Sequence, residues 1–361
     1  MNQYELIDWL LENGGPVVRY RTAKELSDKS EVDIDCLTKD LLSSDKVAKV
    51  LADIEDCSRN INLRNWHSSK KECTENAFSR ALEMGLTQEI QVFYEKVQPF
   101  REWVHFPSPQ DHTPIHSIFF AWCFIRGGFE YDDIIEFVKK RLDYIYISAK
   151  EQVLDIYAKG DELKGIPKKF ADECLRNEYN PYRGDKPLLL IHDLYALAFL
   201  PKKILDEDLK RKVNCVIEYI LKEEFQRIRE GYGYIYLKER NTCYSCGWSP
   251  NLPWYNGFVL KGIDENKLFM RFELMSHFTK AHDNKWFQAC LNHFEQYRTS
   301  EGTYKLPQGY LQEKPSGYYV LGAYMGLESK RTEKALEVES TFRMLAVKKR
   351  IANSIGTECI V

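Results

Sequence analysis

The chain has 361 residues, of which 44% are hydrophobic and 29% charged, and its formal net charge at pH 7 is -3. Phosphate backbones are bound by concentrated basic surfaces, and the chain has no basic block, so nucleic acid is not an expected partner. The first residues carry acids and lack the basic segment of a signal peptide, and no run of about 18 uncharged apolar residues occurs. We therefore expect a cytoplasmic protein without a membrane span.

The first 70 residues predict a helical portion that is less regular than the rest. Residues 9–26 indicate a helix, a turn and a second helix that begins at Pro16, because proline fits the first turn of a helix. Residues 39–53 predict a further helix. Residues 75–84 predict a buried helix, although they are more polar than the later apolar runs.

Four apolar runs later in the chain each follow a proline. Their starts are separated by 73, 66 and 62 residues. Each run is apolar nearly all round, which is typical of a helix buried on every side. The sequence therefore predicts four inner helices that begin near Pro114, Pro187, Pro253 and Pro315.

Between these runs lie segments with a single apolar face. Residues 133–149, 207–228 and 335–345 carry apolar side chains at helical spacing and charges on the other face, which predicts surface helices. An alternation of buried and surface helices at a nearly fixed period indicates a repeat architecture. We predict an all-α fold, an α/α toroid of helical hairpins, in one domain spanning residues 1–361. A linear solenoid and an irregular helical bundle are the alternatives.

Residues 229–253 are the main irregular segment, and they predict a short hairpin near residues 232–236 followed by a long loop. The loop contains Cys243 and Cys246. A zinc site needs a second pair of ligands, and His277 and His282 lie at no common zinc spacing from them, so no metal is expected. We expect the ten cysteines of the chain to be reduced thiols.

The two ends of the chain resemble a known superfamily. The opening DWLLENGGPVVRYRTAKEL and the closing KPSGYYVLGAYMGLESKRTEKALEVESTFRMLAVKKR are similar to small bacterial relatives of terpenoid cyclases and protein prenyltransferases, the squalene–hopene cyclase-like α/α toroids. The resemblance spans most of the chain and is strongest at these ends. It implies an α/α toroid with a central cavity, and it implies no reaction, because most such small relatives lack the cyclase motifs.

The chain also departs from the functional motifs of that superfamily. The nearest match to the proton-donating acid motif of the cyclases is Glu130–Asp133, where acids before an amphipathic helix are typical of helix capping. The glutamine–tryptophan repeats of the large cyclases are absent. No local spacing matches the Asp, Cys and His that hold zinc in protein prenyltransferases.

Acids and histidines near the predicted inner-helix starts are the candidates for chemistry, because the cavity of such a toroid is lined by these starts and the loops before them. Each candidate also has a structural explanation, namely a helix cap, a buried hydrogen bond or a solvated loop position. The candidate catalytic residues are Asp111, His112, His116, His192, Asp193 and Glu313.

Aromatic side chains in the same segments are candidates to line the cavity and bind substrate. The chain contains 22 tyrosines and 7 tryptophans, and aromatic faces suit an apolar or cationic ligand. The candidate substrate-binding residues are Trp248, Trp254, Tyr255, Tyr304, Tyr310, Tyr318 and Tyr319.

The leading functional prediction is an enzyme or binder that acts on an apolar or isoprenoid-like small molecule, with acid–base or cyclisation chemistry. No cofactor is expected, because the common phosphate-loop, dinucleotide and zinc-peptidase motifs are absent. The alternatives are a non-catalytic scaffold and a carbohydrate-active (α/α) barrel, which needs two carboxylates about 5–10 Å apart. If the repeat is correct, Asp111, His116, Asp193, Trp254 and Tyr319 surround one cavity.

Overall fold

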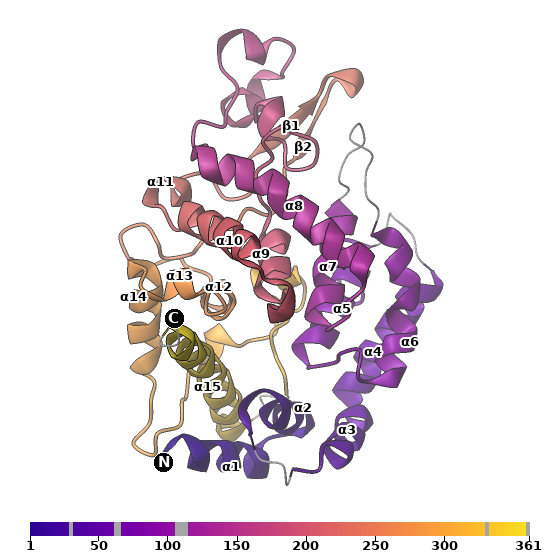
Figure 1. The fold of residues 1–361 in the computed structure, drawn as a ribbon, viewed down its shortest axis with the longest axis vertical. Helices are drawn as coiled ribbons and strands as arrows, with labels where there is room; N and C mark the ends of the chain where they lie inside the picture. Colours follow the sequence, from indigo (N-terminus) through magenta and orange to yellow (C-terminus); the bar gives the residue numbers. More distant parts are fainter. Residues whose placement is uncertain (29–31, 61–65, 105–114, 329–331, 359–361) are drawn as a thin grey trace. The chain divides into compact units, whose positions relative to one another are not determined.

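The computed structural model describes residues 1–28, 32–60, 66–104, 115–328 and 332–358 (Figure 1). Within these ranges the chain is mostly helical and has one two-stranded sheet, which confirms the predicted all-α class. Contacts divide the chain into two compact units, residues 1–101 with 260–361 (unit 1) and residues 102–259 (unit 2). None of the described helices combines the length and the apolar character needed to cross a membrane.

The described part of residues 1–101 contains six α-helices, and a π-helical turn at Thr22–Leu26 follows the second of them. Asn2 caps the first helix by accepting hydrogen bonds from the Tyr4 and Glu5 backbone N–H groups, and Pro16 occupies the first position of the second. The predicted helix–turn–helix is therefore confirmed. The helices are α1 (Gln3–Asn13), α2 (Pro16–Arg21), α3 (Ile34–Ser43), α4 (Asp45–Arg59), α5 (Thr74–Glu83) and α6 (Gln91–Val97).

Helix α5 is buried over its whole length although many of its residues are polar. The structure thus confirms the buried helix predicted at residues 75–84. Buried polar groups are costly unless they are hydrogen-bonded, so each of these side chains requires a partner inside unit 1. The polar residues of α5 include Glu75, Asn76, Ser79, Arg80 and Glu83.

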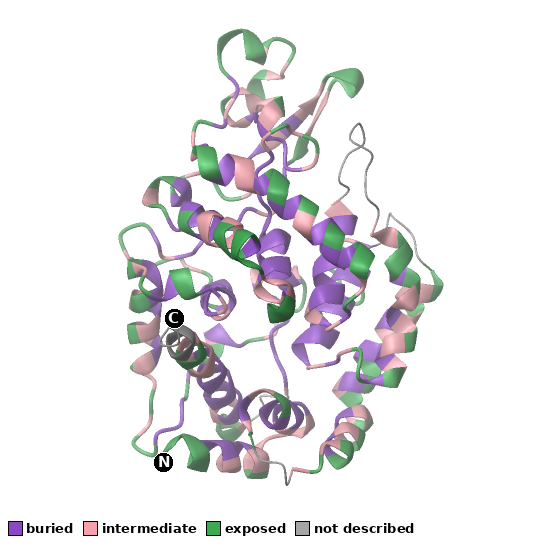
Figure 2. Ribbon diagram, in the orientation of Figure 1, coloured by how far each residue is buried: buried purple, intermediate pink, exposed green. Residues whose placement is uncertain are grey.

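The second half of unit 1 contains α12 (Glu265–Met275), α13 (Thr279–His282), α14 (Lys285–Glu295) and α15 (Glu333–Glu358). The prediction of a surface helix at residues 335–345 is only partly correct. The helix is present, but residues 338–347 are all buried, and they include charged side chains (Figure 2). The one-sided apolar pattern wrongly indicated an exposed polar face. The polar side chains of this face are buried, and Arg343 among them pairs with buried carboxylates.

Unit 2 is built on α7 (Ile115–Arg126), α8 (Asp132–Glu151), α9 (Ile191–Ala198), α10 (Glu207–Ile220) and α11 (Glu223–Gln226). Helix α8 packs against α10, and α7 packs against α9. Helices α7 and α9 are almost entirely buried, whereas α8 and α10 each bury one apolar face. The two predicted surface helices of this unit are therefore confirmed, with the second ending at Ile220 rather than at residue 228.

The only sheet among the described residues is a hairpin of β1 (Tyr234–Leu237) and β2 (Thr242–Ser245) in unit 2. The strands are antiparallel, with Tyr234 opposite Ser245. The predicted hairpin is present, but it spans residues 234–245 rather than 232–236, and its second strand lies in the segment that was predicted as a loop.

Two of the four predicted inner helices are wrong. Residues 253–260 form turns, in which Trp254, Gly257 and Phe258 have φ values of 68°, 75° and 53°. An α-helix requires negative φ at every residue, so this backbone cannot be helical. The run also ends exposed at the surface, with 62% of Val259 accessible to solvent.

The run after Pro315 contains only one short 3-10 turn, at Tyr319–Leu321. Gly317 and Gly322 flank it with φ values of 149° and 82°. The run is nonetheless largely buried. Its apolar composition was therefore a correct sign of burial, but it was not a sign of a helix. Of the other two runs, α9 begins four residues after Pro187, and α7 begins at Ile115, with Pro114 outside the described residues.

Candidate functional site

The candidates from the sequence divide between the two units. Asp111 and His112 lie outside the described residues. The candidates in unit 2 are His116, His192, Asp193, Trp248, Trp254 and Tyr255. The candidates in unit 1 are Tyr304, Tyr310, Glu313, Tyr318 and Tyr319.

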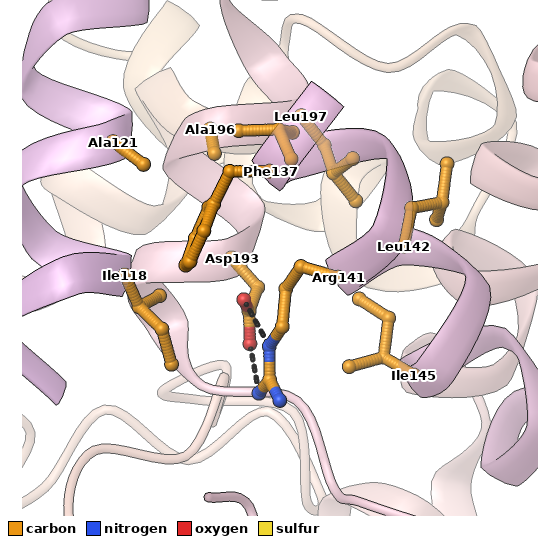
Figure 3. A pocket seen from close by; sticks show the side chains of 10 residues that line it. Ile118, Ala121, Phe137, Arg141, Leu142, Ile145, Asp193, Ala196 and Leu197 are labelled. Carbon is orange, nitrogen blue, oxygen red and sulfur yellow. Dashed lines mark hydrogen bonds and ion pairs between the residues drawn. The ribbon is translucent and has the colours of Figure 1, made fainter. Parts of the chain in front are cut away.

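In unit 2, Asp193 is held by Arg141, which the sequence did not indicate (Figure 3). The Arg141 guanidinium donates from Nε to Asp193 Oδ1 and from Nη2 to Asp193 Oδ2, both at 2.9 Å. Arg141 also donates from Nη1 to the Pro181 carbonyl at 2.7 Å, and Asp193 Oδ2 accepts from the Leu190 N–H at 2.7 Å. Asp193 therefore acts as a buried structural ion-pair partner, and it also binds the backbone N–H of Leu190, the residue that precedes α9.

A small cavity adjoins this ion pair, with a volume of about 10 Å³ and a mainly apolar lining from α7, α8 and α9 (Figure 3). A space of this size holds about one water molecule. His192 is buried, and its ring is nearly perpendicular to that of Phe119, with the two ring centroids 6.1 Å apart. Asp193 and His192 thus contribute to the packing of unit 2, and this cavity has no room for a substrate.

The remaining candidates of unit 2 lie in separate surroundings. The half-buried His116 makes an edge-on ring contact with Trp103, and the two ring centroids are 5.4 Å apart. The Trp248 carbonyl accepts a hydrogen bond from the Ile191 N–H at 2.8 Å. Trp254 contacts Phe258 edge-on at 5.7 Å, and the Tyr255 hydroxyl donates to the backbone carbonyl of Leu221.

The CxxC pair belongs to the hairpin of unit 2. Cys243 lies on β2 opposite Tyr236, and the Cys246 N–H donates to the Gly233 carbonyl at 2.9 Å. Both are free thiols, and burial raises the pKa of Cys246 well above its ordinary value. Within the described ranges, no three His, Cys, Asp or Glu side chains are grouped so that they could hold a metal ion.

Two candidate tyrosines of unit 1 are tied to α14. The Tyr304 hydroxyl donates to the Glu295 carboxylate, with its two oxygens at 2.9 and 3.0 Å. The Tyr310 hydroxyl and His293 Nε2 are 2.7 Å apart. Both tyrosines are buried and hold the 297–311 segment against the helix.

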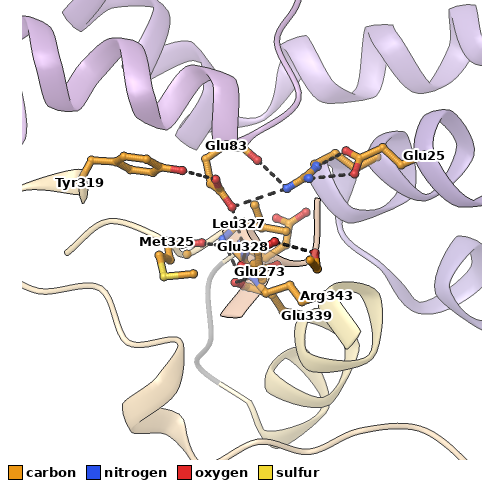
Figure 4. Close-up of polar contacts among 12 residues, drawn as sticks. Glu25, Glu83, Glu273, Tyr319, Met325, Leu327, Glu328, Glu339 and Arg343 are labelled. Carbon is orange, nitrogen blue, oxygen red and sulfur yellow. Dashed lines mark hydrogen bonds and ion pairs between the residues drawn. The ribbon is translucent and has the colours of Figure 1, made fainter. Parts of the chain in front are cut away.

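A network of buried charges centred on Arg343 occupies the interior of unit 1 (Figure 4). Arg343 is 1% exposed, and its Nη1 lies 2.9 Å from Glu83 Oε1 and 2.6 Å from Glu273 Oε2. Its Nε lies 3.2 Å from Glu339 Oε1. Burial lowers the pKa of Arg343, but the three carboxylates outweigh it and raise the pKa overall.

Tyr319 joins this network through Glu83. Its hydroxyl donates to Glu83 Oε2 at 2.5 Å, and Arg21 Nη1 donates to the Glu83 backbone carbonyl at 2.8 Å. Arg21 in turn pairs with Glu25, from Nε at 2.5 Å and from Nη2 at 2.9 Å. Because every one of these groups is engaged by another, the network stabilises unit 1 and leaves Tyr319 as a packing residue.

Glu313 bridges two lysines in the same unit. Its carboxylate oxygens lie 3.0 Å from Lys46 Nζ and 3.1 Å from Lys71 Nζ. Burial raises the pKa of Glu313, but the two ammonium groups outweigh this effect, so the pKa is lowered below its ordinary value. An ionised, doubly paired carboxylate is a poor proton donor, which argues against Glu313 as a general acid.

The sequence missed the group in unit 1 that is best suited to chemistry. His67 Nδ1 is hydrogen-bonded to Glu75 Oε2, and the Glu75 side chain is fully buried while the His67 side chain is 31% exposed. The His67 ring stacks on Tyr318 with the centroids 4.8 Å apart and the planes 23° apart, and Trp66 lies 5.1 Å from it. Tyr318 is the only sequence candidate in this group.

Electrostatics favour the charged form of this imidazole. Burial lowers the pKa of His67, but the hydrogen bond and the negative charge of Glu75 outweigh it, and the pKa is raised above its ordinary value. Burial raises the pKa of the Tyr318 hydroxyl, which therefore stays protonated. One sequence signal could have found the pair: a glutamate in a helix predicted to be buried requires a partner nearby.

A carboxylate that holds one ring nitrogen fixes the orientation of an imidazole, and this is the arrangement of histidine and acid in known acid–base pairs. The other charged groups described above are bound to one another. Comparisons with protein-family models, with curated proteins and with solved structures give no match for this chain. A functional proposal for this chain therefore has to be based on the geometry of the described residues.

Proposed function

We propose that this protein is an enzyme that transfers protons to and from an apolar or isoprenoid-like small molecule, with His67 as the acid–base group and Glu75 as the residue that orients it. The single observation that carries this proposal is an imidazole, partly exposed, whose Nδ1 is held by a fully buried carboxylate. A histidine at the surface without such a carboxylate has neither a fixed ring orientation nor a raised pKa.

The aromatic surroundings support an apolar substrate. Tyr318 stacks on the His67 ring, and the buried Trp66 contacts the same ring at a tilt of 40°, so the imidazole lies in an aromatic environment. Aromatic side chains provide a large contact area at low entropic cost, and their faces also attract cationic groups. Tyr318, a candidate substrate-binding residue from the sequence, keeps that role in this proposal.

The acidity of the group favours one class of reaction over another. An imidazolium is a weak acid with a pKa near neutrality, so it matches proton transfer at oxygen, nitrogen or an activated carbon atom. Protonation of an alkene, the first step of the cyclases that the sequence resembles, needs a much stronger acid. We therefore propose acid–base chemistry such as isomerisation, elimination or hydrolysis, and not cyclisation initiated by alkene protonation.

We also propose that the helical hairpins belong to an α/α toroid related to the terpenoid cyclases and prenyltransferases. Two observations support this relationship. The two ends of the sequence resemble members of that superfamily, and unit 2 alternates the buried helices α7 and α9 with the one-sided helices α8 and α10. A buried helix followed by an amphipathic one is the repeating unit of such a fold.

A proton-exchange experiment tests the proposed activity on many compounds at once. The protein is incubated in D₂O with a panel of isoprenoid alcohols, ketones and esters and with an extract of small molecules from cells. After return to H₂O, mass spectrometry identifies the compounds that have gained carbon-bound deuterium or changed in mass faster than in a sample without protein. We expect at least one compound to react with the wild-type protein and to react at least about 100-fold more slowly with His67→Gln, the loss typical of a missing acid–base group.

His293→Gln is the matched control, because His293 is the histidine of unit 1 whose ring is bound to Tyr310 and plays no part in the proposed site. It should retain the activity. If no compound reacts with the wild-type protein, or if His67→Gln reacts as fast as wild type, the proposal is wrong. A non-catalytic scaffold would then explain the fold better.

A further inference from the structure

The neighbour of Glu75 on α5, Asn76, has an arrangement of hydrogen bonds that is unusually complete. Its side chain is fully buried. The amide Nδ2 donates to the carbonyl oxygens of Ser68, Lys70 and Gly317 at 3.1, 2.8 and 3.0 Å. The amide Oδ1 accepts from the Tyr319 backbone N–H at 2.9 Å.

These four contacts require an asparagine. A carboxamide carries two N–H donors and one acceptor oxygen at the end of a short side chain, so here one N–H is shared between two carbonyls. An aspartate would face the three carbonyl oxygens with no donor, and an alanine would leave all four backbone groups without this partner. Asparagine is also a weaker helix former than alanine, so α5 gains nothing from it as a helix residue.

The contacts fasten two segments that are far apart in the sequence. Ser68 and Lys70 follow His67 in one loop, whereas Gly317 and Tyr319 flank Tyr318 in another. The loops are also joined directly, because the Gly317 N–H donates to the Ser69 carbonyl at 2.8 Å. Asn76 thus fixes the backbone on both sides of Tyr318 and immediately after His67.

We infer that Asn76 is the positioning residue of the proposed site, whose amide aligns the loop of His67 with the loop of Tyr318 so that the imidazole meets both Glu75 and the tyrosine ring. This inference rests on the proposed function for its catalytic meaning, but its structural content stands by itself. Glu75 and Asn76 are consecutive in α5, so one turn of a rigid helix supplies both the charge that the imidazole needs and the amide that holds its loop.

The inference predicts a change in His67 that loss of stability alone does not cause. Without the amide the 66–70 loop gains freedom, the hydrogen bond from His67 to Glu75 is populated for less of the time, and the stacking on Tyr318 weakens. We expect the pKa of His67 in Asn76→Ala to fall toward its ordinary value by about 0.5 unit or more. Glu75→Gln defines the full effect of losing the charge partner.

The measurement is an NMR titration of the intact protein with ¹³C-labelled histidine, in which the His67 signal is assigned from its absence in His67→Gln. The ring-current shift that Tyr318 imposes on His67 is a second readout, and Tyr318→Leu gives its zero value. The matched control is Ser79→Ala. Ser79 is also buried on α5 and donates to the Glu75 carbonyl at 2.6 Å, but neither loop is among the partners of its hydroxyl.

In Ser79→Ala both readouts should stay at wild-type values even though the protein is less stable. If Asn76→Ala lowers the unfolding midpoint but leaves the pKa and the ring-current shift of His67 unchanged, Asn76 has a structural role only, and the inference is overturned. Should Asn76→Ala fail to fold, Asn76→Ser keeps one donor and one acceptor and should give intermediate values of both quantities; wild-type values in that variant also overturn the inference.

The outcomes separate this inference from the proposed function. The titration needs no substrate, so an unchanged His67 pKa refutes the positioning role even when His67→Gln abolishes a measured reaction. Conversely, a shifted pKa in a protein that turns over no compound keeps the positioning role and refutes the proposed enzyme.

Discussion

The ion pair of Arg141 and Asp193 shows how one side chain changes meaning when its partner is known. The sequence identified Asp193 as a polar residue in an apolar helix that needs a hydrogen-bond partner. The partner comes from α8, 52 residues earlier, and it reaches both oxygens of the carboxylate. Fork-like pairing of this kind gives geometric specificity as well as energy.

Breaking that pair from one side should be costly. Arg141→Met leaves the carboxylate of Asp193 buried and without its cation, and we expect a loss of about 3–5 kcal/mol in the free energy of unfolding. The double variant Arg141→Met/Asp193→Leu should recover most of this loss, because it removes both charges together. Urea denaturation followed by circular dichroism measures both values. A loss below about 1 kcal/mol in the single variant would contradict this account of the pair.

Glu313 should make stability depend on pH in the acid range. Its folded-state pKa is lowered, so the stability that it contributes is fully present above the ordinary glutamate pKa and is lost as the pH falls through the lowered value. We expect Glu313→Gln to cost about 1 kcal/mol at pH 7, and the difference from wild type should shrink steadily below about pH 4.

Thermal unfolding at several pH values between neutrality and about pH 3 measures this difference. The control is Glu333→Gln, because Glu333 pairs with Lys305 at the exposed surface and also has a lowered pKa. Because water screens this exposed pair, Glu333→Gln should change the unfolding temperature far less than Glu313→Gln at every pH. A Glu313→Gln difference that is the same at all pH values would show that the carboxylate contributes by packing alone.

Asp193 and His67 show what the sequence can and cannot reveal about a single residue. A buried polar side chain can be recognised from its apolar neighbours, as Asp193 was, but the identity of its partner is set by tertiary packing. His67 itself was missed because it lies in a short irregular segment without periodicity, and the only signal that pointed toward it was the glutamate of the buried helix that follows. Its importance comes from Glu75, eight residues later, and from Tyr318, which is 251 residues away in the chain.

At the scale of elements, periodicity predicted the amphipathic helices well and the uniformly apolar runs poorly. Helices α8 and α10 were found from their spacing, because only a helix places such residues on one face. A run that is apolar all round carries no period, so burial in a helix and burial in a folded loop look alike. Residues 253–260 and 315–327 are mainly loops. Glycines with positive φ interrupt both runs, at Gly257 in the first and at Gly317 and Gly322 in the second, and positive φ is incompatible with an α-helix.

The buried middle of α15 leads to a prediction about charge geometry. Arg343 contacts Glu83 and Glu273 through Nη1 and Glu339 through Nε, so one planar group reaches three carboxylates in a fixed geometry that the ammonium of a lysine cannot reproduce. Arg343→Lys should therefore destabilise unit 1 by roughly 2–4 kcal/mol although the charge is kept. Lys334→Arg, an exposed exchange near the start of the same helix, should have no effect in the same denaturation experiment. Equal stability of both variants would show that only the net charge of the network matters.

At the scale of the whole molecule, the contacts separate residues 102–259 from the two halves of unit 1 that flank them in sequence. One domain was predicted from the sequence, although the segment just after the first boundary is rich in proline, at Pro107, Pro109 and Pro114. The two halves of unit 1 are joined by specific bonds, such as those from the Val17 and Val18 N–H groups to Glu328 Oε1 at 2.7 and 3.2 Å.

Removal of residues 333–361 should therefore affect the two units differently. Without α15, Glu83 and Glu273 lose Arg343, and α1 loses a packing partner. Hydrogen–deuterium exchange with mass spectrometry should show rapid exchange throughout α1–α6 and α12–α14, while α7–α10 keep their protection. Unchanged protection of α1–α6 would show that unit 1 does not depend on α15, and loss of protection in α7–α10 would show that unit 2 depends on it.

The discontinuity of unit 1 also sets the order of events on the ribosome. Residues 102–259 are contiguous, so unit 2 can close as soon as it has been made, whereas Glu83 of α5 emerges early and meets Arg343 only after all the intervening residues have been added. At roughly 5–20 residues per second this interval is roughly 10–50 s. During that time the acids of α5 lack their cation and the nascent helices lack their core, so the first hundred residues are the part of the chain most exposed to aggregation during synthesis.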